Sequence, residues 1–129
     1  MITKRLLQFN LLISTLTAIA FIFAPGPILS LLGIRGDGPF FVIPRYFGAT
    51  HIAFGTLLWL ALRADDPRFL RFIVISFFAG DLTGTAALLF AQLRGAMGPM
   101  GWAFVFLSFL FAVGYGYCTI LENSVANHS

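Results

Sequence analysis

The side chains best placed to do chemistry are Asp81, His51, Arg45 and Thr85, which lie within long apolar stretches. Asp81 stands near the middle of the apolar run 72–93. A carboxylate at such a depth in a bilayer costs roughly 2.5–3.5 kcal/mol on insertion scales, so it needs a partner or a function that offsets this cost. His51 and Arg45, on the preceding apolar run, are the basic candidates.

The positions of His51 and Asp81 predict that the two side chains meet. His51 lies fifteen residues before Asp66 and Asp81 fifteen residues after it. In an antiparallel helical hairpin that turns at Asp66, both residues lie roughly 20 Å from the turn. Arg45 is about 9 Å further out, so its side chain can bend back toward Asp81 or extend to the outer surface, and Thr85 flanks the carboxylate.

Two interpretations of this constellation stay open. In the first, His51 and Asp81 satisfy each other and fix the register of the helices. In the second, they form a polar pocket that binds a ligand or relays protons, because ionisable residues inside membranes mark functional sites. Asn10 and Gln8, near the start of the chain, are expected to bond across helices or to headgroups.

The motifs of known enzyme classes are missing. Cys118 is the only cysteine, which excludes an intrachain disulfide or a CxxC site. No GxSxG, HExxH, Walker or dinucleotide pattern occurs. We therefore predict no enzymatic activity, no cofactor and no metal. A lipid-directed enzyme with a site near Tyr115, Tyr117 and Glu122 is the least favoured hypothesis.

The composition is that of an integral membrane protein. Of 129 residues, 59% are hydrophobic and 10% are charged, and the mean hydropathy is +0.92. A soluble domain has about a quarter of its residues charged. The net charge of +3 comes from cations at the ends of apolar runs, so no nucleic-acid partner is expected.

Apolar runs of about 20 residues predict membrane helices. The segment 28–33 is too short to cross and predicts a short interfacial helix, with Pro27 in its first turn and Gly33 closing it. The predicted fold is all-α, a four-helix membrane bundle in one domain, 1–122, followed by a flexible tail, 123–129. The predicted spans are residues 6–24, 40–62, 72–93 and 102–121.

The distribution of basic residues predicts that both termini are cytoplasmic, in the plasma (inner) membrane. With this orientation five Lys and Arg residues face the cytoplasm and three face outward. The first run resembles a signal peptide, but it continues through residues 21–23, which favours a retained anchor. The Trp and Tyr residues fall toward the span ends, at the expected headgroup level: Tyr46, Trp59, Trp102, Tyr115 and Tyr117.

Small residues recur at helical spacing in three of the predicted spans. They allow helix backbones to approach closely, either within one bundle or between two copies. The predicted partners are therefore membrane lipid and a membrane protein or a second copy of the chain. The predicted packing residues are Gly48, Gly55, Gly80, Gly84, Ala112 and Gly116.

Two short motifs carry a resemblance to a known group of proteins. Pro-Ile-Leu-Ser-Leu-Leu-Gly occupies 27–33, and Arg-Tyr-Phe-Gly occupies 45–48, with Gly55 seven residues later. In these motifs and in its layout, the chain resembles small bacterial four-span membrane proteins of the DoxX-like, domain-of-unknown-function type. The resemblance implies a single four-helix membrane domain and adds no chemistry.

The predicted function is that of a non-enzymatic multi-pass membrane protein, an assembly, scaffold or accessory subunit. Small-residue faces, short loops and the lack of catalytic motifs favour this interpretation. The alternative is a protein that handles a small solute, a lipid or protons through Asp81, His51 and Arg45.

Overall fold

The computed structural model describes residues 2–36, 38–64 and 66–126, with the backbone alone from 121 to 126. Helices make up nearly all of these ranges and no strand occurs in them, which confirms the all-α prediction. The predicted tail 123–129 lies outside the residues whose side chains are described, and the backbone as far as residue 126 is helical. In chain order the elements are α1 (Ile2–Phe23), α2 (Pro25–Leu31), the 3₁₀ helix η1 (Pro39–Phe41), α3 (Val42–Arg63), α4 (Pro67–Leu93) and α5 (Gly101–Ala126).

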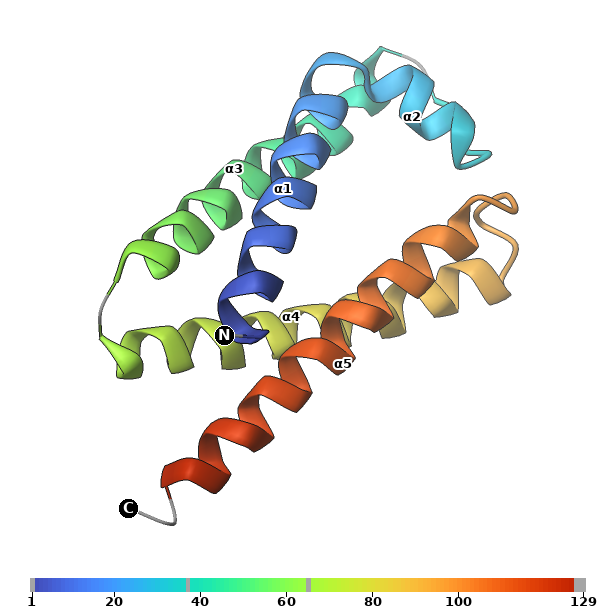
Figure 1. Cartoon of the computed structure of the whole chain (residues 1–129). Helices are drawn as coiled ribbons and strands as arrows, with labels where there is room; N and C mark the ends of the chain where they lie inside the picture. The colour runs from blue at the N-terminus through green and yellow to red at the C-terminus, as the bar shows by residue number, and fades with distance from the viewer. Residues whose placement is uncertain (1, 37, 65, 127–129) are drawn as a thin grey trace.

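The four long helices form two packed pairs (Figure 1). Helix α1 packs along α3, and α4 packs along α5, whereas α3 and α4 diverge from the turn that connects them. We call the end of the molecule with Ile2 and Asp66 the inner end, and the end with α2 and the 94–100 turn the outer end.

The pairs meet in a hydrophobic core near the inner end. All four long helices contribute to it. The largest of its side chains with less than 2% of their surface exposed are Leu7, Leu58, Val74, Tyr115 and Cys118.

Ordinary capping signals set the helix boundaries. The Asp66 side chain accepts a hydrogen bond from the Arg68 N–H (2.8 Å) at the start of α4. Helix α2 begins at Pro25, three residues before the predicted segment 28–33, because proline suits the first turn of a helix. Gly33 (φ 74°) and Gly95 (φ 71°) follow α2 and α4 in the left-handed conformation.

A backbone contact joins the pairs at the outer end. The carbonyl oxygen of Leu32, after α2, accepts a hydrogen bond from the Gly98 N–H (2.6 Å), in the turn before α5. A Cβ atom on Gly33 would lie 2.9 Å from the Gly98 nitrogen. Glycine at position 33 therefore serves both the left-handed backbone and the close approach of the two segments.

Three of the described helices are long and apolar enough to cross a membrane: Ile2–Phe23, Pro67–Leu93 and Gly101–Ile120. Helix α3 is not among them. It is 22 residues long, but it contains Arg45, His51 and Arg63, which lower its hydropathy. The fourth span and the four-helix bundle therefore stay predictions.

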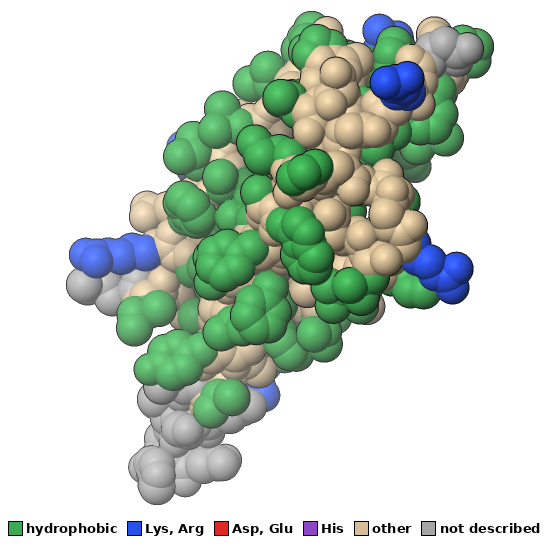
Figure 2. All heavy atoms as spheres, turned by 90° about the vertical axis from the view of Figure 1, so that its right-hand side faces the viewer, with side chains coloured by type: hydrophobic (Ala, Val, Ile, Leu, Met, Phe, Trp, Pro, Cys, Tyr) green, Lys and Arg blue, Asp and Glu red, His purple; other side chains and the backbone are tan. Residues whose placement is uncertain are grey.

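The surface is consistent with this composition. Figure 2 shows hydrophobic side chains across the middle of one face, with Lys and Arg side chains toward its margins. Many large hydrophobic side chains are exposed, as expected for helices whose surroundings are lipid tails.

We predict that Gly33→Ala destabilises the protein more than Gly95→Ala. Both substitutions force a Cβ into a left-handed conformation, which costs about 1–2 kcal/mol. Only Gly33 also meets the Gly98 backbone, since a Cβ on Gly95 meets nothing within 4 Å. Thermal unfolding in detergent micelles measures the difference. Equal losses for the two variants would mean that the outer contact contributes nothing to stability.

Candidate functional site

Asp81 lies on the side of α4 that faces α5. Its backbone carbonyl accepts hydrogen bonds from the hydroxyls of Thr85 (2.7 Å) and Ser108 (3.2 Å), and Thr85 also donates to Ser108 (3.0 Å). The side chain is half-buried, and its Oδ2 atom is buried without a hydrogen-bond partner. Asp81 therefore presents an unsatisfied acceptor in an apolar environment, which is unfavourable unless a donor or a proton is supplied.

The structure does not bring His51 to Asp81. The His51 Nδ1–H donates to the Phe47 carbonyl (2.9 Å), and the ring packs against Phe47 and Phe54, with centroid distances of 4.3 and 5.5 Å. Among the described residues, no hydrogen bond or ion pair joins His51 to Asp81. The expected contact required a packed α3–α4 hairpin, but these helices diverge to pack on α1 and α5 (Figure 1).

A row of aromatic rings joins α3 to α4 and α5. Phe54 of α3 contacts Phe77 of α4 edge-on at 5.9 Å, and Phe77 stacks on Tyr115 of α5 at 5.7 Å. His51 contacts Phe54 and so belongs to the same row. Apolar packing, rather than the expected polar pocket, therefore connects α3 to α4.

The other two predicted site residues do not bond the carboxylate either. Arg45 is exposed near the outer end of α3, as in the outward orientation, and no ion pair joins it to Asp81 among the described residues. The Thr85 hydroxyl bonds the backbone of Asp81 and the side chain of Ser108 rather than the carboxylate. Thr85 therefore joins α4 to α5 next to Asp81, and its hydroxyl hydrogen is not available to the carboxylate.

A buried polar cluster does form, between α1 and α5. The Asn10 side chain donates to the Tyr115 hydroxyl (2.7 Å), and the Ser14 hydroxyl donates to Asn10 (3.1 Å). Asn10 and Ser14 are 6% and 4% exposed, and Tyr115 is fully buried. Asp81 contributes to the electrostatic environment of the Tyr115 hydroxyl, but no hydrogen bond joins its buried Oδ2 to that hydroxyl. We call Asn10, Ser14 and Tyr115 the polar cluster.

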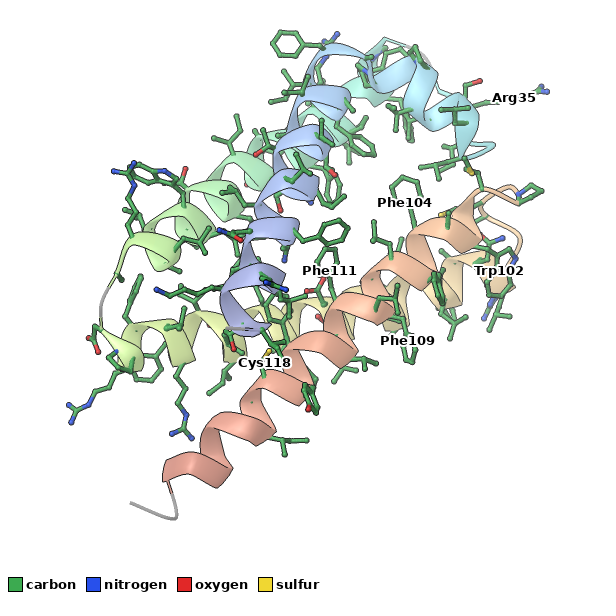
Figure 3. The ribbon with its side chains drawn as sticks, in the orientation of Figure 1. Arg35, Trp102, Phe104, Phe109, Phe111 and Cys118 are labelled. Atoms are coloured by element: carbon green, nitrogen blue, oxygen red, sulfur yellow. The ribbon has the colours of Figure 1, made fainter. Side chains whose placement is uncertain are left out.

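Tyr115 corrects a prediction made from the sequence. Its position near the end of the predicted span suggested a ring at headgroup level, but it belongs to the core. Figure 3 shows Phe104 and Phe111 pointing from α5 to the side where α1 lies, and Phe109 pointing away from it. Tyr115, which stacks on Phe111 with centroids 6.2 Å apart, shares the inward side.

A signal for the cluster was present in the sequence. Asn10 and Ser14 continue the buried stripe of α1, with spacings of three and four residues from Leu7, Ala18 and Phe21. Polar residues within such a stripe point into the protein rather than toward headgroups, so this spacing indicates an interhelical bond.

The predicted packing residues divide into three groups. Gly48 lies against the backbone of α1, because a Cβ there would lie 3.0 Å from the Ala18 carbonyl oxygen. Gly80 lies at an open position, because a Cβ on it would meet no atom within 4 Å. The others lie in helix contacts: Gly55 by Leu11, Gly84 by Ser108, Gly116 by Phe78, and Ala112 in the core at 3% exposure.

The remaining reactive side chains lie in different surroundings. Cys118 is a buried free thiol in the core, where a cysteine behaves as a small hydrophobic side chain. Of the residues suggested for a lipid-directed enzyme, Tyr115 is buried, Tyr117 is exposed and the Glu122 side chain lies outside the described residues. Among the described residues no group of three or more His, Cys, Asp or Glu side chains is placed to hold a metal ion.

No protein-family model, curated protein or solved structure matches this chain. The resemblance to DoxX-like four-span proteins therefore stays a prediction.

We predict that Tyr115→Phe lowers the free energy of unfolding by about 1–2 kcal/mol, because it leaves the Asn10 amide buried without its acceptor. Tyr117→Phe is the matched control, since Tyr117 is 52% exposed. Thermal unfolding of both variants in the same detergent tests the difference. An unchanged midpoint for Tyr115→Phe would show that the Asn10 bond is not needed to join α1 to α5.

Proposed function

We propose that this chain is a non-enzymatic multi-pass membrane protein that acts as an assembly, scaffold or accessory subunit in a bacterial inner membrane. Three apolar helices support the membrane location. Helix α3 serves as the fourth span, since its 22 residues extend about 33 Å and it packs along α1. Both termini then lie on the cytoplasmic side, as the distribution of basic residues favours.

The observation that carries this proposal is an uncovered small-residue face on α4. Ser76, Gly80, Thr83 and Ala87 are spaced by three and four residues and are all exposed. Both hydroxyls bond carbonyls of their own helix, Ser76 to Phe72 (2.8 Å) and Thr83 to residue 79 (2.9 Å). The side chains at these four positions are therefore small, and neither hydroxyl is free to donate a hydrogen bond to a partner.

A second helix can pack more favourably against this face than lipid tails can. Association of helices in a bilayer depends on close backbone approach, which small residues permit. Only 11% of the apolar window of α4 is buried, against 28% in both α1 and α5. The occupant is a helix of a partner membrane protein or α4 of a second copy.

Gly80→Leu tests this assignment. The new side chain enters open space, so we expect normal folding but loss of the partner or of self-association, because the helices can no longer approach. Affinity capture from native membranes, followed by quantification of the co-purifying proteins and of the oligomer mass, measures both.

Ala103→Leu is the matched control, because it enlarges an exposed small residue on α5 and leaves the α4 face intact. It should capture the same proteins as the wild type. Identical capture by Gly80→Leu and the wild type would contradict a docking role for this face.

A second candidate function, the handling of a proton, small solute or lipid, is favoured by the orphaned oxygen of Asp81. Its buried Oδ2 lacks a donor and the Tyr115 hydroxyl is nearby. A carboxyl group that takes up and releases a proton would relieve this unsatisfied state for part of its cycle. In this hypothesis the side chains near Asp81 are those of the polar cluster, and His51 and Arg45 are not part of the site.

We predict that Asp81→Asn keeps expression and fold, since the amide has the same shape and the backbone bonds of Asp81 to Thr85 and Ser108 are unchanged, whereas it abolishes any proton flux. The measurement is proton uptake by reconstituted vesicles under an applied pH gradient. Asp81→Glu, which keeps a titratable carboxyl, should retain flux. If wild type and Asp81→Asn vesicles are equally permeable while Asp81→Leu fails to accumulate, the carboxylate is structural.

A further inference from the structure

An open groove of about 500 Å³ lies between α1 and α3. Its walls include Leu11 and Ile19 from α1, and Ile52 and Trp59 from α3. The α4 face described above is not part of it. What the groove can hold follows from its shape, its lining and the charges at its end.

The shape is that of a wedge which widens toward the inner end. At Gly48 the helices touch, with the Ala18 carbonyl 3.0 Å from a Cβ on the glycine. At Gly55 the nearest atoms are side-chain tips of Leu11 (3.7 Å) and Thr15 (3.9 Å), with no backbone in reach. Figure 1 shows the same divergence of α1 and α3 below their outer contact.

The lining is apolar in effect, although it contains three polar side chains. The Thr15 and Thr56 hydroxyls donate to the carbonyls four residues earlier in their own helices, at 2.8 and 2.9 Å. The His51 Nδ1–H does the same with Phe47. Because these donors are occupied, the walls suit a hydrocarbon chain better than a polar solute.

Two cations flank the wide end of the groove. The Arg63 guanidinium stands over the Trp59 ring, 4.2 Å from its centroid. Lys4 precedes Leu11 by seven residues and so lies on the same face of α1. Gly55 of α3 lies beside Leu11 of α1, and Arg63 follows Gly55 by eight residues. At the rise of an α-helix, both cations therefore lie about 10–12 Å closer to the inner end than the Leu11–Gly55 contact. Both are exposed, and no described carboxylate pairs with them.

We propose that the groove binds one acyl chain of an anionic phospholipid, whose phosphate is held by Arg63 and Lys4. The guanidinium can donate two parallel hydrogen bonds to phosphate oxygens, and its place on the Trp59 ring orients it at the groove mouth. Trp59 is itself suited to the headgroup boundary. The lipid chain enters from the wide end and stops where Gly48 closes the wedge.

Native mass spectrometry of the purified full chain tests this site with phosphatidylglycerol and phosphatidylcholine of identical acyl chains. The wild type should retain phosphatidylglycerol in preference. Arg63→Gln should weaken phosphatidylglycerol binding roughly tenfold, since it removes a charge-assisted contact. Gly55→Leu should weaken both lipids, because the leucine side chain fills the groove.

Arg68→Gln is the matched control, with the same change of charge at an exposed position at the start of α4. It should bind phosphatidylglycerol as the wild type does. An equal loss in Arg63→Gln and Arg68→Gln would reduce the effect to bulk charge and overturn the site. Wild-type binding by a folded Gly55→Leu variant would overturn the groove as the place of the acyl chain.

Discussion

In a bilayer, lipid tails are as apolar as leucine, so two helix pairs gain little from apolar contact alone. The hydrogen bond between Asn10 and Tyr115 links α1 of one pair to α5 of the other, within the core at the inner end. The Leu32–Gly98 backbone bond is its counterpart at the outer end. The relative position of the pairs depends on these two polar contacts, because between them the apolar surfaces have no strong preference for each other over lipid.

This arrangement leaves different surfaces open for different partners. Helix α4, which touches mainly α5, keeps its small-residue face uncovered, and that face suits a helix backbone. The pair of α1 and α3 crosses closely at Gly48 and then separates, which leaves a wedge suited to a flexible chain. A rigid, straight helix fits the first surface and not the second. The proposed protein partner and the proposed lipid therefore do not compete.

The polar residues were predictable in type but not in pairing. Asp81 stood out because a carboxylate in a long apolar run is unfavourable, and the structure places one of its oxygens buried and unpartnered. The choice of His51 as its partner assumed that helices joined by a short turn pack together. Here α3 and α4 each pack mainly on another helix, and the contact between them includes the rings of Phe54 and Phe77 rather than a bond between His51 and Asp81. Tyr115 was expected at the membrane interface, but it lies in the core, where the buried Asn10 side chain donates a hydrogen bond to its hydroxyl.

The sequence by itself determined the helices and, to within about five residues, where they end. The signals for the helices are local. Runs of apolar residues predict the helices, prolines at positions 25 and 67 lie in the first turn of α2 and α4, and Gly33 and Gly95 follow the last turn of the same two helices. Only the tertiary structure decided which helices are neighbours, and with that which polar side chains meet. Neighbour choice depends on the fit of whole helix surfaces, such as the Gly48 contact with α1, and apolar composition alone does not distinguish one such surface from another.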